Sequence, residues 1–302
     1  MSASAVADAY GLADDPSWED VRWEDHERSV RVRGARVAYV DLGPTDPDAP
    51  AAAPLVLLHG FGGCWQNWLP TIPPLARSRR VIGVDLPGFG ASALPRDLPT
   101  PAAFARVVEA LCEELDLGPV VLAGNSLGGL VATIVAGRSP DRVERLALLA
   151  PVGGAHIARV ALEAGPKILG MQLDPVLRRT PLRSREHPLA TLVHDPAALS
   201  PRLMRAALLP GAGKPGVPLA ALGIGLQGVR HANLDGLLRR ITAPTLLIWG
   251  LGDRLLPSRT AETFTRGIAD ARLVVLDDTG HVPQLERPRT VNRLLRQFAD
   301  GS

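Results

Sequence analysis

Six short, nearly continuous apolar runs constrain the fold of this 302-residue chain more than any other feature. The runs cover residues 55–58, 81–84, 120–122, 146–149, 245–249 and 273–276. Strands have this composition when helices cover both faces of a parallel sheet. Helical periodicity lies between the runs and is clearest over residues 104–115 and 291–298. The alternation predicts an α/β architecture with a mostly parallel central sheet flanked by helices.

The same pattern divides the chain into a leader, a core and an insertion. Residues 1–28 are rich in acidic side chains and lack strong periodicity, so we expect a loosely ordered leader. Alternating apolar residues on either side of Gly34 predict a β-hairpin where the core begins. The core would comprise residues 29–152 and 241–302. Residues 153–240 hold no convincing strand, which predicts a helical cap inserted after the sixth strand.

Composition excludes several classes of function. With 46% hydrophobic and 21% charged residues, the chain can bury one large domain, or a core with an insertion. The formal net charge is only +2 and the basic residues are scattered, so we expect no nucleic-acid partner. Cys64 and Cys112 are the only cysteines, and we interpret both as buried free thiols. No spacing indicates a metal site or a cofactor, and the composition leaves the oligomeric state open.

The beginning of the chain carries no targeting signal that we recognise. Residues 1–8 lack both the basic region and the apolar run of a signal peptide. No later apolar stretch is long enough to span a bilayer. We therefore expect a cytoplasmic protein with no membrane partner.

One of the apolar runs leads directly into a candidate nucleophile. The hexapeptide after it reads Gly124-Asn125-Ser126-Leu127-Gly128-Gly129, and a helical pattern follows. A serine in so sharp a turn from strand to helix has a strained backbone, and the chain can approach itself there only without side chains at 124 and 128. The motif alone is weak evidence, because most surface serines only cap helices. A base and an acid must support it.

Candidate partners follow the ends of three other runs. Asp253 lies in a tight turn after 245–249, and His281 follows 273–276, which suits an acid that orients a base. After 55–58 comes a glycine-rich turn containing Gly60, where the N–H of Phe61, with that of Leu127, would form a two-donor oxyanion hole. The preceding residue, His59, is expected to be a hydrogen-bonded turn residue rather than a base. Asp277 and Asp278 precede His281 too closely to face its ring.

These motifs resemble those of the α/β-hydrolase fold family over residues 29–300. The matching segments are His59-Gly60-Phe61-Gly62-Gly63, residues 85–92, residues 124–129, residues 249–253 and residues 280–288. The resemblance implies a helical cap, a catalytic triad of Ser126, Asp253 and His281, and no cofactor or metal. It leaves the substrate open, since one fold hosts many chemistries.

Within that family, Ser126 argues against the branches that use an aspartate nucleophile. The sequence Gly124-Asn125-Ser126 resembles the Gly-Asn-Ser that is frequent in C–C bond hydrolases acting on ring-cleavage products. Those enzymes usually carry a bulky aromatic residue after the catalytic histidine, where this chain has Val282. We therefore expect a carboxylesterase-like hydrolase that forms an acyl-enzyme with a small, largely apolar substrate. C–C bond hydrolysis is the second hypothesis, together with a serine-dependent acyltransferase, cyclase or lyase. A non-catalytic ligand-binding protein is the least favoured.

Three residues near the motifs are candidates to line the substrate pocket. Asn125 and Val282 flank the proposed nucleophile and base, and Trp65 follows the glycine-rich turn. For Trp65 we favour packing in the core over contact with substrate.

Overall fold

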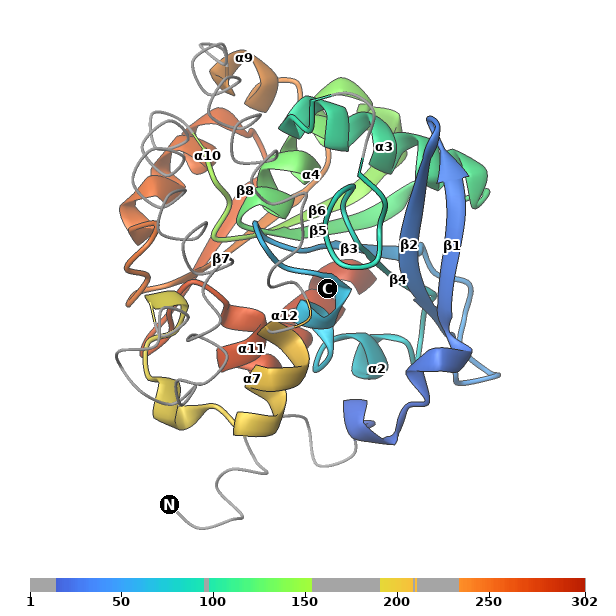
Figure 1. The fold of residues 1–302 in the computed structure, drawn as a ribbon. Coiled ribbons are helices and arrows are strands. Elements are labelled where there is room, and N and C mark those ends of the chain that lie inside the picture. The colour runs from blue at the N-terminus through green and yellow to red at the C-terminus, as the bar shows by residue number, and fades with distance from the viewer. Residues whose placement is uncertain (1–14, 95–97, 154–190, 209, 211–233, 302) are drawn as a thin grey trace.

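The computed structural model describes residues 15–94, 98–153, 191–208, 210 and 234–301. An eight-stranded sheet with the order β1-β2-β4-β3-β5-β6-β7-β8 runs through the molecule (Figure 1). Its strands are β1 (Glu27–Val32), β2 (Ala35–Leu42), β3 (Leu55–Leu58), β4 (Val81–Val84), β5 (Val120–Asn125), β6 (Val143–Leu149), β7 (Thr245–Gly250) and β8 (Ala271–Leu276). The pairs from β4 to β8 are parallel, whereas β2 pairs antiparallel with β1 and with β4. The predicted mostly parallel sheet and the hairpin are confirmed.

Helices cover both faces of this sheet. In Figure 1, α3 (Pro101–Glu114), α4 (Leu127–Arg138) and α10 (Ala261–Gly267) lie on one side. On the other side lie α2 (Ile72–Leu75), α11 (Pro283–Glu286) and α12 (Pro288–Asp300). Two apolar clusters result, one containing Phe104 and Phe264 and the other containing Ile72 and Val291. Burial on both faces explains why the parallel strands read as continuous apolar runs.

The register of the parallel strands brings the proposed site together. Leu58 at the end of β3 pairs with Gly124 of β5, and Asn125 pairs with Leu149 at the end of β6. Farther across the sheet, at the carboxyl ends of β7 and β8, Gly250 pairs with Leu276. The loops that follow these carboxyl ends therefore lie along one edge of the sheet, where ligands bind in open α/β folds.

The segment before the hairpin packs against the core from residue 15 onward. It contains two 3-10 turns, η1 (Trp18–Asp20) and η2 (Trp23–Asp25). The ring of Trp23 lies 5.0 Å from that of Trp65 between centroids, and Arg296 pairs with Asp15 at 3.0 Å. These contacts give residues 15–25 a defined place. Residues 1–14 of the predicted leader lie outside the described residues.

Part of the predicted cap is described. It contributes η7 (Pro196–Ala198), α7 (Pro201–Leu208) and α9 (Leu234–Leu238). The α7 helix packs against η3 (Trp65–Trp68), where Asn67 Nδ2 donates to the Ala207 carbonyl. Residues 154–190, 209 and 211–233 of the predicted cap lie outside the described residues. In the described parts of the chain, no helix is long and apolar enough to cross a membrane.

Candidate active site

Ser126 lies in the turn between β5 and α4 with a backbone that L-amino acids rarely adopt. Its φ is 54° and its ψ is −114°. Positive φ is uncommon for residues with a side chain and persists only where neighbouring contacts enforce it. Here the Ser126 N–H donates to the Leu149 carbonyl at 2.9 Å, and its carbonyl accepts from Leu130 and Val152, each at 3.1 Å. The end of β6 and the first turn of α4 thus hold the predicted strained turn in place.

Two glycines allow this turn to close. A Cβ on Gly124 would collide with the Gly128 carbonyl group, and a Cβ on Gly128 would collide with the carbonyls of Leu58 and His59. The obstacles are backbone atoms, which cannot rotate away as a side chain can. Both are positions where the sequence analysis expected glycine, and the contact at Gly128 brings the turn against the end of β3.

His281 and Asp253 form a buried hydrogen-bonded pair. Nδ1 of His281 lies 2.8 Å from Oδ2 of Asp253, and both side chains are almost fully buried. The other oxygen, Oδ1, accepts from the N–H groups of Leu255 at 2.9 Å and Leu256 at 2.8 Å. A carboxylate that accepts at Nδ1 places the proton on that nitrogen, which leaves Nε2 as the basic atom. Nε2 is buried and has no hydrogen-bond partner.

The loops that carry Asp253 and His281 are joined by further bonds. The Gly252 N–H donates to the Thr279 carbonyl at 2.9 Å, and Trp249 Nε1 closes the Asp253 loop on the Leu256 carbonyl at 2.8 Å. The side chain of Asp278 is 77% exposed, so it does not compete with Asp253 for the imidazole. The acid and the base are therefore held by the backbone of two adjacent loops.

Asn125 connects the serine turn to the histidine loop. Its amide nitrogen donates to the Leu149 carbonyl at 3.0 Å and to the His281 carbonyl at 3.1 Å. Asn125 is buried. Both amide hydrogens therefore serve backbone acceptors.

The glycine-rich turn after β3 lies beside Ser126. A Cβ on Gly60 would be 3.3 Å from Cβ of Ser126, so the predicted donor Phe61 follows a residue in contact with the serine. Leu127 is the first residue of α4, and the N–H groups of a first helical turn lack partners within the helix. The two predicted oxyanion donors thus flank Ser126 in the chain and in the adjoining loop.

His59 is a hydrogen-bonded turn residue, as predicted. Its Nδ1 lies 2.7 Å from the Gly60 carbonyl, and Nε2 accepts from the Leu86 N–H at 3.0 Å. Burial lowers the pKa of His59 to about 4, because the charged imidazolium would lose its hydration. The ring is neutral at physiological pH, and both of its nitrogens are occupied.

Trp65 and Val282 are both buried in the apolar cluster that contains α11 and α12. The ring of Trp65 packs on Trp23, and its backbone N–H donates to Asp85 Oδ1 at 2.7 Å. Core packing, the role we favoured for Trp65, agrees with these contacts.

The two cysteines are free and buried, as predicted. Burial raises the pKa of the Cys112 thiol to about 11, so this thiol stays protonated near neutral pH. Among the described residues, no group of three His, Cys, Asp or Glu side chains is placed to hold a metal ion.

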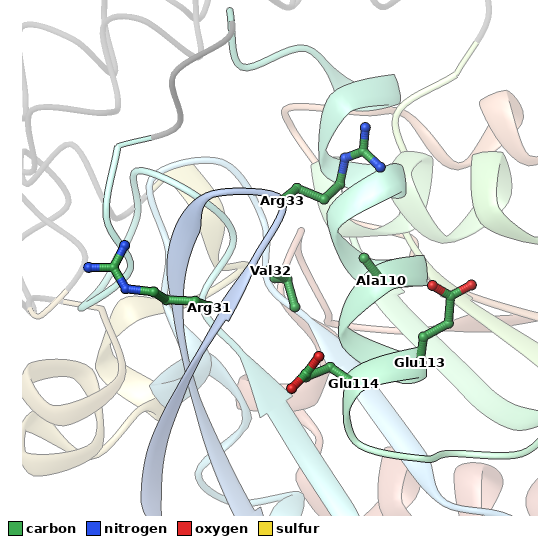
Figure 2. Close-up of a pocket in the computed structure, with 6 residues that line it drawn as sticks. All are labelled: Arg31, Val32, Arg33, Ala110, Glu113 and Glu114. Carbon is green, nitrogen blue, oxygen red and sulfur yellow. The ribbon is translucent and has the colours of Figure 1, made fainter.

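A surface groove lies elsewhere, between the β1–β2 hairpin and α3 (Figure 2). It is lined by Arg31, Val32, Arg33, Ala110, Glu113 and Glu114. None of these is a predicted site residue, and the charges of both signs at its rim are typical of a solvated surface.

Glu286 contacts the histidine loop and was given no role by the sequence analysis. Its carboxylate accepts from the N–H of Gly280 at 2.8 Å and from that of His194 at 2.7 Å. The only signal in the sequence was its place in the segment 280–288, five residues after His281. The contact joins His194 to a residue 92 positions later in the chain, and no local pattern could reveal it.

Comparison with known proteins identifies the class to which this fold and site belong. A family model described as the alpha/beta hydrolase fold matches residues 53–288. The chain belongs to the α/β-hydrolase fold family.

Three relatives show the range of activities near this chain. It is 32% identical over 275 residues to the dihydrolipoyllysine-residue acetyltransferase component of the acetoin cleaving system of Pseudomonas putida, covering 90% of this chain and 68% of that protein. It is 33% identical over 261 residues to the pimeloyl-[acyl-carrier protein] methyl ester esterase of Aromatoleum aromaticum, covering 82% and 98%. It is 32% identical over 269 residues to the 2-hydroxymuconate semialdehyde hydrolase of a Pseudomonas species, covering 83% and 88%.

Proposed function

We propose that this protein is a serine hydrolase that cleaves an ester, or a related acyl bond, of a small and largely apolar substrate. The observation that carries the proposal is the buried His281–Asp253 pair, whose Nε2 has no hydrogen-bond partner and whose loop is joined through Asn125 to the strained turn at Ser126. Nucleophile, base and orienting acid follow three different strands of one sheet, in the chain order typical of this family. Similarity to an esterase over nearly the whole length of that relative supports the same reaction class.

In the proposed mechanism Ser126 attacks the carbonyl carbon of the ester. His281 accepts the hydroxyl proton at Nε2 and returns it to the leaving alcohol, while Asp253 keeps the ring oriented and stabilises the imidazolium. The N–H groups of Phe61 and Leu127 stabilise the negative charge on the substrate oxygen. Water then attacks the acyl group on Ser126, with His281 acting again as the base. Burial strengthens each of these interactions, since water competes less in a low-dielectric site.

The cap would supply the substrate-binding surface. We propose that residues 153–240 form a lid over the carboxyl ends of the strands. This insertion contains no Phe, Tyr or Trp. Its lining would therefore be aliphatic and would provide no phenol as a proton donor, which favours an apolar acyl group.

Two neighbouring reactions use the same serine and supply the alternatives. One relative is a 2-hydroxymuconate semialdehyde hydrolase. This chain carries the Asn125-Ser126 pair that we associated with C–C bond hydrolases. Another relative is an acetyltransferase, in which an acyl group passes to an acceptor other than water. The three reactions differ in the acceptor or in the bond that breaks, so substrate tests separate them.

The test is hydrolysis of p-nitrophenyl esters of increasing acyl length by the wild type and by Ser126→Ala. We expect turnover by the wild type and none above background with the variant. Ser29→Ala, at an exposed serine of β1, is the matched control and should retain full activity. Labelling of Ser126 by a fluorophosphonate without turnover of any ester would contradict ester hydrolysis and direct the search to the other two reactions.

A further inference from the structure

The backbone around His281 is held from several directions. The His281 N–H donates to the Leu192 carbonyl at 2.8 Å, and the His281 carbonyl accepts from Asn125 at 3.1 Å. Just before the histidine, the N–H group of Gly280 donates to the carboxylate of Glu286 at 2.8 Å. Together with the bond from the ring to Asp253, these contacts restrict the peptide as well as the imidazole.

Glu286 reaches these groups because α11 begins two residues after His281 and turns the chain back. The Glu286 N–H itself donates to the Val282 carbonyl at 3.1 Å. The residue is only 7% exposed, and burial raises the pKa of its carboxyl group to about 7. Hydrogen bonds from backbone N–H groups and the nearby Arg287 favour the charged form and oppose this shift. The buried carboxylate of Glu286 therefore binds the backbone of the loop that carries His281.

The segment 192–194 supplies the second half of this arrangement. One oxygen of Glu286 binds the Gly280 N–H and the other binds the His194 N–H, so the carboxylate bridges the two chain segments. The approach is close, since a Cβ on Gly280 would lie 2.7 Å from the His194 nitrogen and 2.8 Å from the carbonyl carbon of Val193. The His194 carbonyl also accepts from Arg254, next to Asp253, at 3.4 Å. This segment therefore contacts the loops of both the proposed base and the proposed acid.

We propose that Glu286 is a positioning residue for the reaction: by joining the segment 192–194 to the peptide of His281, it sets the direction of the imidazole relative to Ser126. The inference rests on the proposed function, because it concerns the group assigned as the base. The hydrogen bonds of the Glu286 carboxylate go to the backbone N–H groups of Gly280 and His194, and not to Ser126 or the imidazole ring. Its effect would pass through the backbone of the loop.

The direct test is Glu286→Gln, which preserves shape but puts an NH₂ group where one oxygen now accepts from an N–H donor. A displacement of catalytic groups by about 1 Å can lower the rate by on the order of 10²-fold. We expect kcat for a p-nitrophenyl ester to fall by this order while KM stays within about twofold, because substrate-binding groups are untouched. Glu262→Gln, at an exposed glutamate of α10, is the matched control and should leave both constants unchanged.

Two further measurements separate positioning from folding and from substrate choice. The rate at which a fluorophosphonate labels Ser126 should fall in parallel with kcat, and the far-downfield proton resonance of the His281–Asp253 bond should shift or broaden. Both are measured on protein whose near-ultraviolet circular dichroism matches the wild type. If Glu286→Gln does not fold, Glu286→Asp replaces it. The aspartate side chain is one methylene shorter and is expected not to reach both Gly280 and His194.

An unchanged kcat and labelling rate in a folded Glu286 variant would overturn the proposal. A rise in KM alone would also overturn it, by assigning Glu286 to substrate binding. If the wild type hydrolyses no ester, the proposed function fails by itself. The labelling rates of wild type and variant then still decide the role of Glu286.

Discussion

Two buried histidines follow the ends of two strands of the same sheet, and they differ in what their nitrogens contact. His59 after β3 and His281 after β8 are 0% and 3% exposed. Both nitrogens of His59 are engaged by backbone groups of Gly60 and Leu86. His281 has a carboxylate at Nδ1 and no partner at Nε2. The two histidines are alike in burial and in their position after a strand, so only their hydrogen-bond partners distinguish them.

The difference shows how the fold makes one histidine a structural residue and the other a candidate base. A carboxylate partner fixes the tautomer of the His281 ring, whereas burial keeps the His59 ring neutral. An unpartnered buried nitrogen lowers the stability of the fold, and a catalytic role is one reason for such a group to be retained. The loop after β8 thus carries an unsatisfied group that the loop after β3 avoids, and this group is the one the proposed reaction needs.

The largest expected effect comes from exchanging each histidine for glutamine. His281→Gln should lower kcat/KM by on the order of 10⁴- to 10⁶-fold, as for other members of a triad. His59→Gln should destabilise the fold by about 1–3 kcal/mol, since the Leu86 N–H loses its acceptor, and leave kcat of the folded protein near wild type. Ester kinetics and denaturant unfolding of both variants measure these effects. Loss of activity in His59→Gln but not in His281→Gln would mean that the base has been misassigned.

A second, slightly smaller effect is expected from the carboxylate that distinguishes His281 from His59. Asp253→Asn should lower kcat by about 10⁴-fold, because an amide favours the wrong tautomer of the imidazole. Asp278→Asn, at the exposed neighbouring acid, is the control and should change kcat by less than about twofold. Equal losses in both variants, measured with the same ester, would mean that the acid has been misassigned.

The sequence predicted much of this comparison, for identifiable reasons. Strand β3, which precedes His59, appeared as an apolar run because helices cover both faces of the sheet. The turns at Gly60 and Gly124 were recognisable because close backbone approach requires glycine. Strand β8 is an exception: it reads as a continuous apolar run, yet as an edge strand it leaves Leu273 38% and Val275 42% exposed.

Contacts between segments distant in the chain were not predictable. The amide of Asn125, proposed to line the pocket, donates to the carbonyls of Leu149 and His281, and Glu286 binds the N–H of His194, 92 residues away in the chain. Neither bond leaves a periodic or local signature, since each depends on the register of the sheet and on the path of the chain above it. The partner of a buried polar side chain therefore had to come from the structure.

The pH dependence of stability provides a third way to test the role of His59. Its pKa is lowered from 6.5 to about 4, so between these values the unfolded chain binds more protons and unfolding is favoured as the pH falls. The contribution of His59 is therefore complete above pH 6.5 and is lost towards pH 4. Between pH 7 and pH 4 the free energy of unfolding of the wild type should accordingly fall by on the order of 3 kcal/mol relative to that of His59→Gln, which is enough to cancel or reverse the destabilisation caused by the substitution.

Glu286 acts in the opposite direction and must be separated from His59. Its pKa is raised from 4.5 to about 7, so its contribution is complete below pH 4.5 and is lost as the pH rises through 7. Because Glu286 is present in both proteins, the difference between His59→Gln and the wild type isolates the histidine. Urea unfolding at several pH values measures it, and a constant difference would contradict a neutral, buried His59.

The smallest effect concerns the contact between the loop after β3 and the serine turn. Gly128→Ala should destabilise the protein by about 1–3 kcal/mol, because the added Cβ meets the carbonyls of Leu58 and His59. The matched control is Gly118→Ala, where a Cβ would meet nothing within 4 Å, and which should be neutral or slightly stabilising. Thermal unfolding of the two variants compares them. Equal stability would mean that this contact is looser than the structure indicates.

The central claim, an acyl-enzyme on Ser126 formed with the help of His281, is tested most directly by rapid quenching and intact-protein mass spectrometry during turnover of a p-nitrophenyl ester. The account predicts a burst of nitrophenol and one added acyl mass per chain, located on the peptide containing Ser126. The same adduct should be absent from His281→Gln within the burst time. Turnover without an acyl group on Ser126, or with the acyl group on another residue, would contradict it.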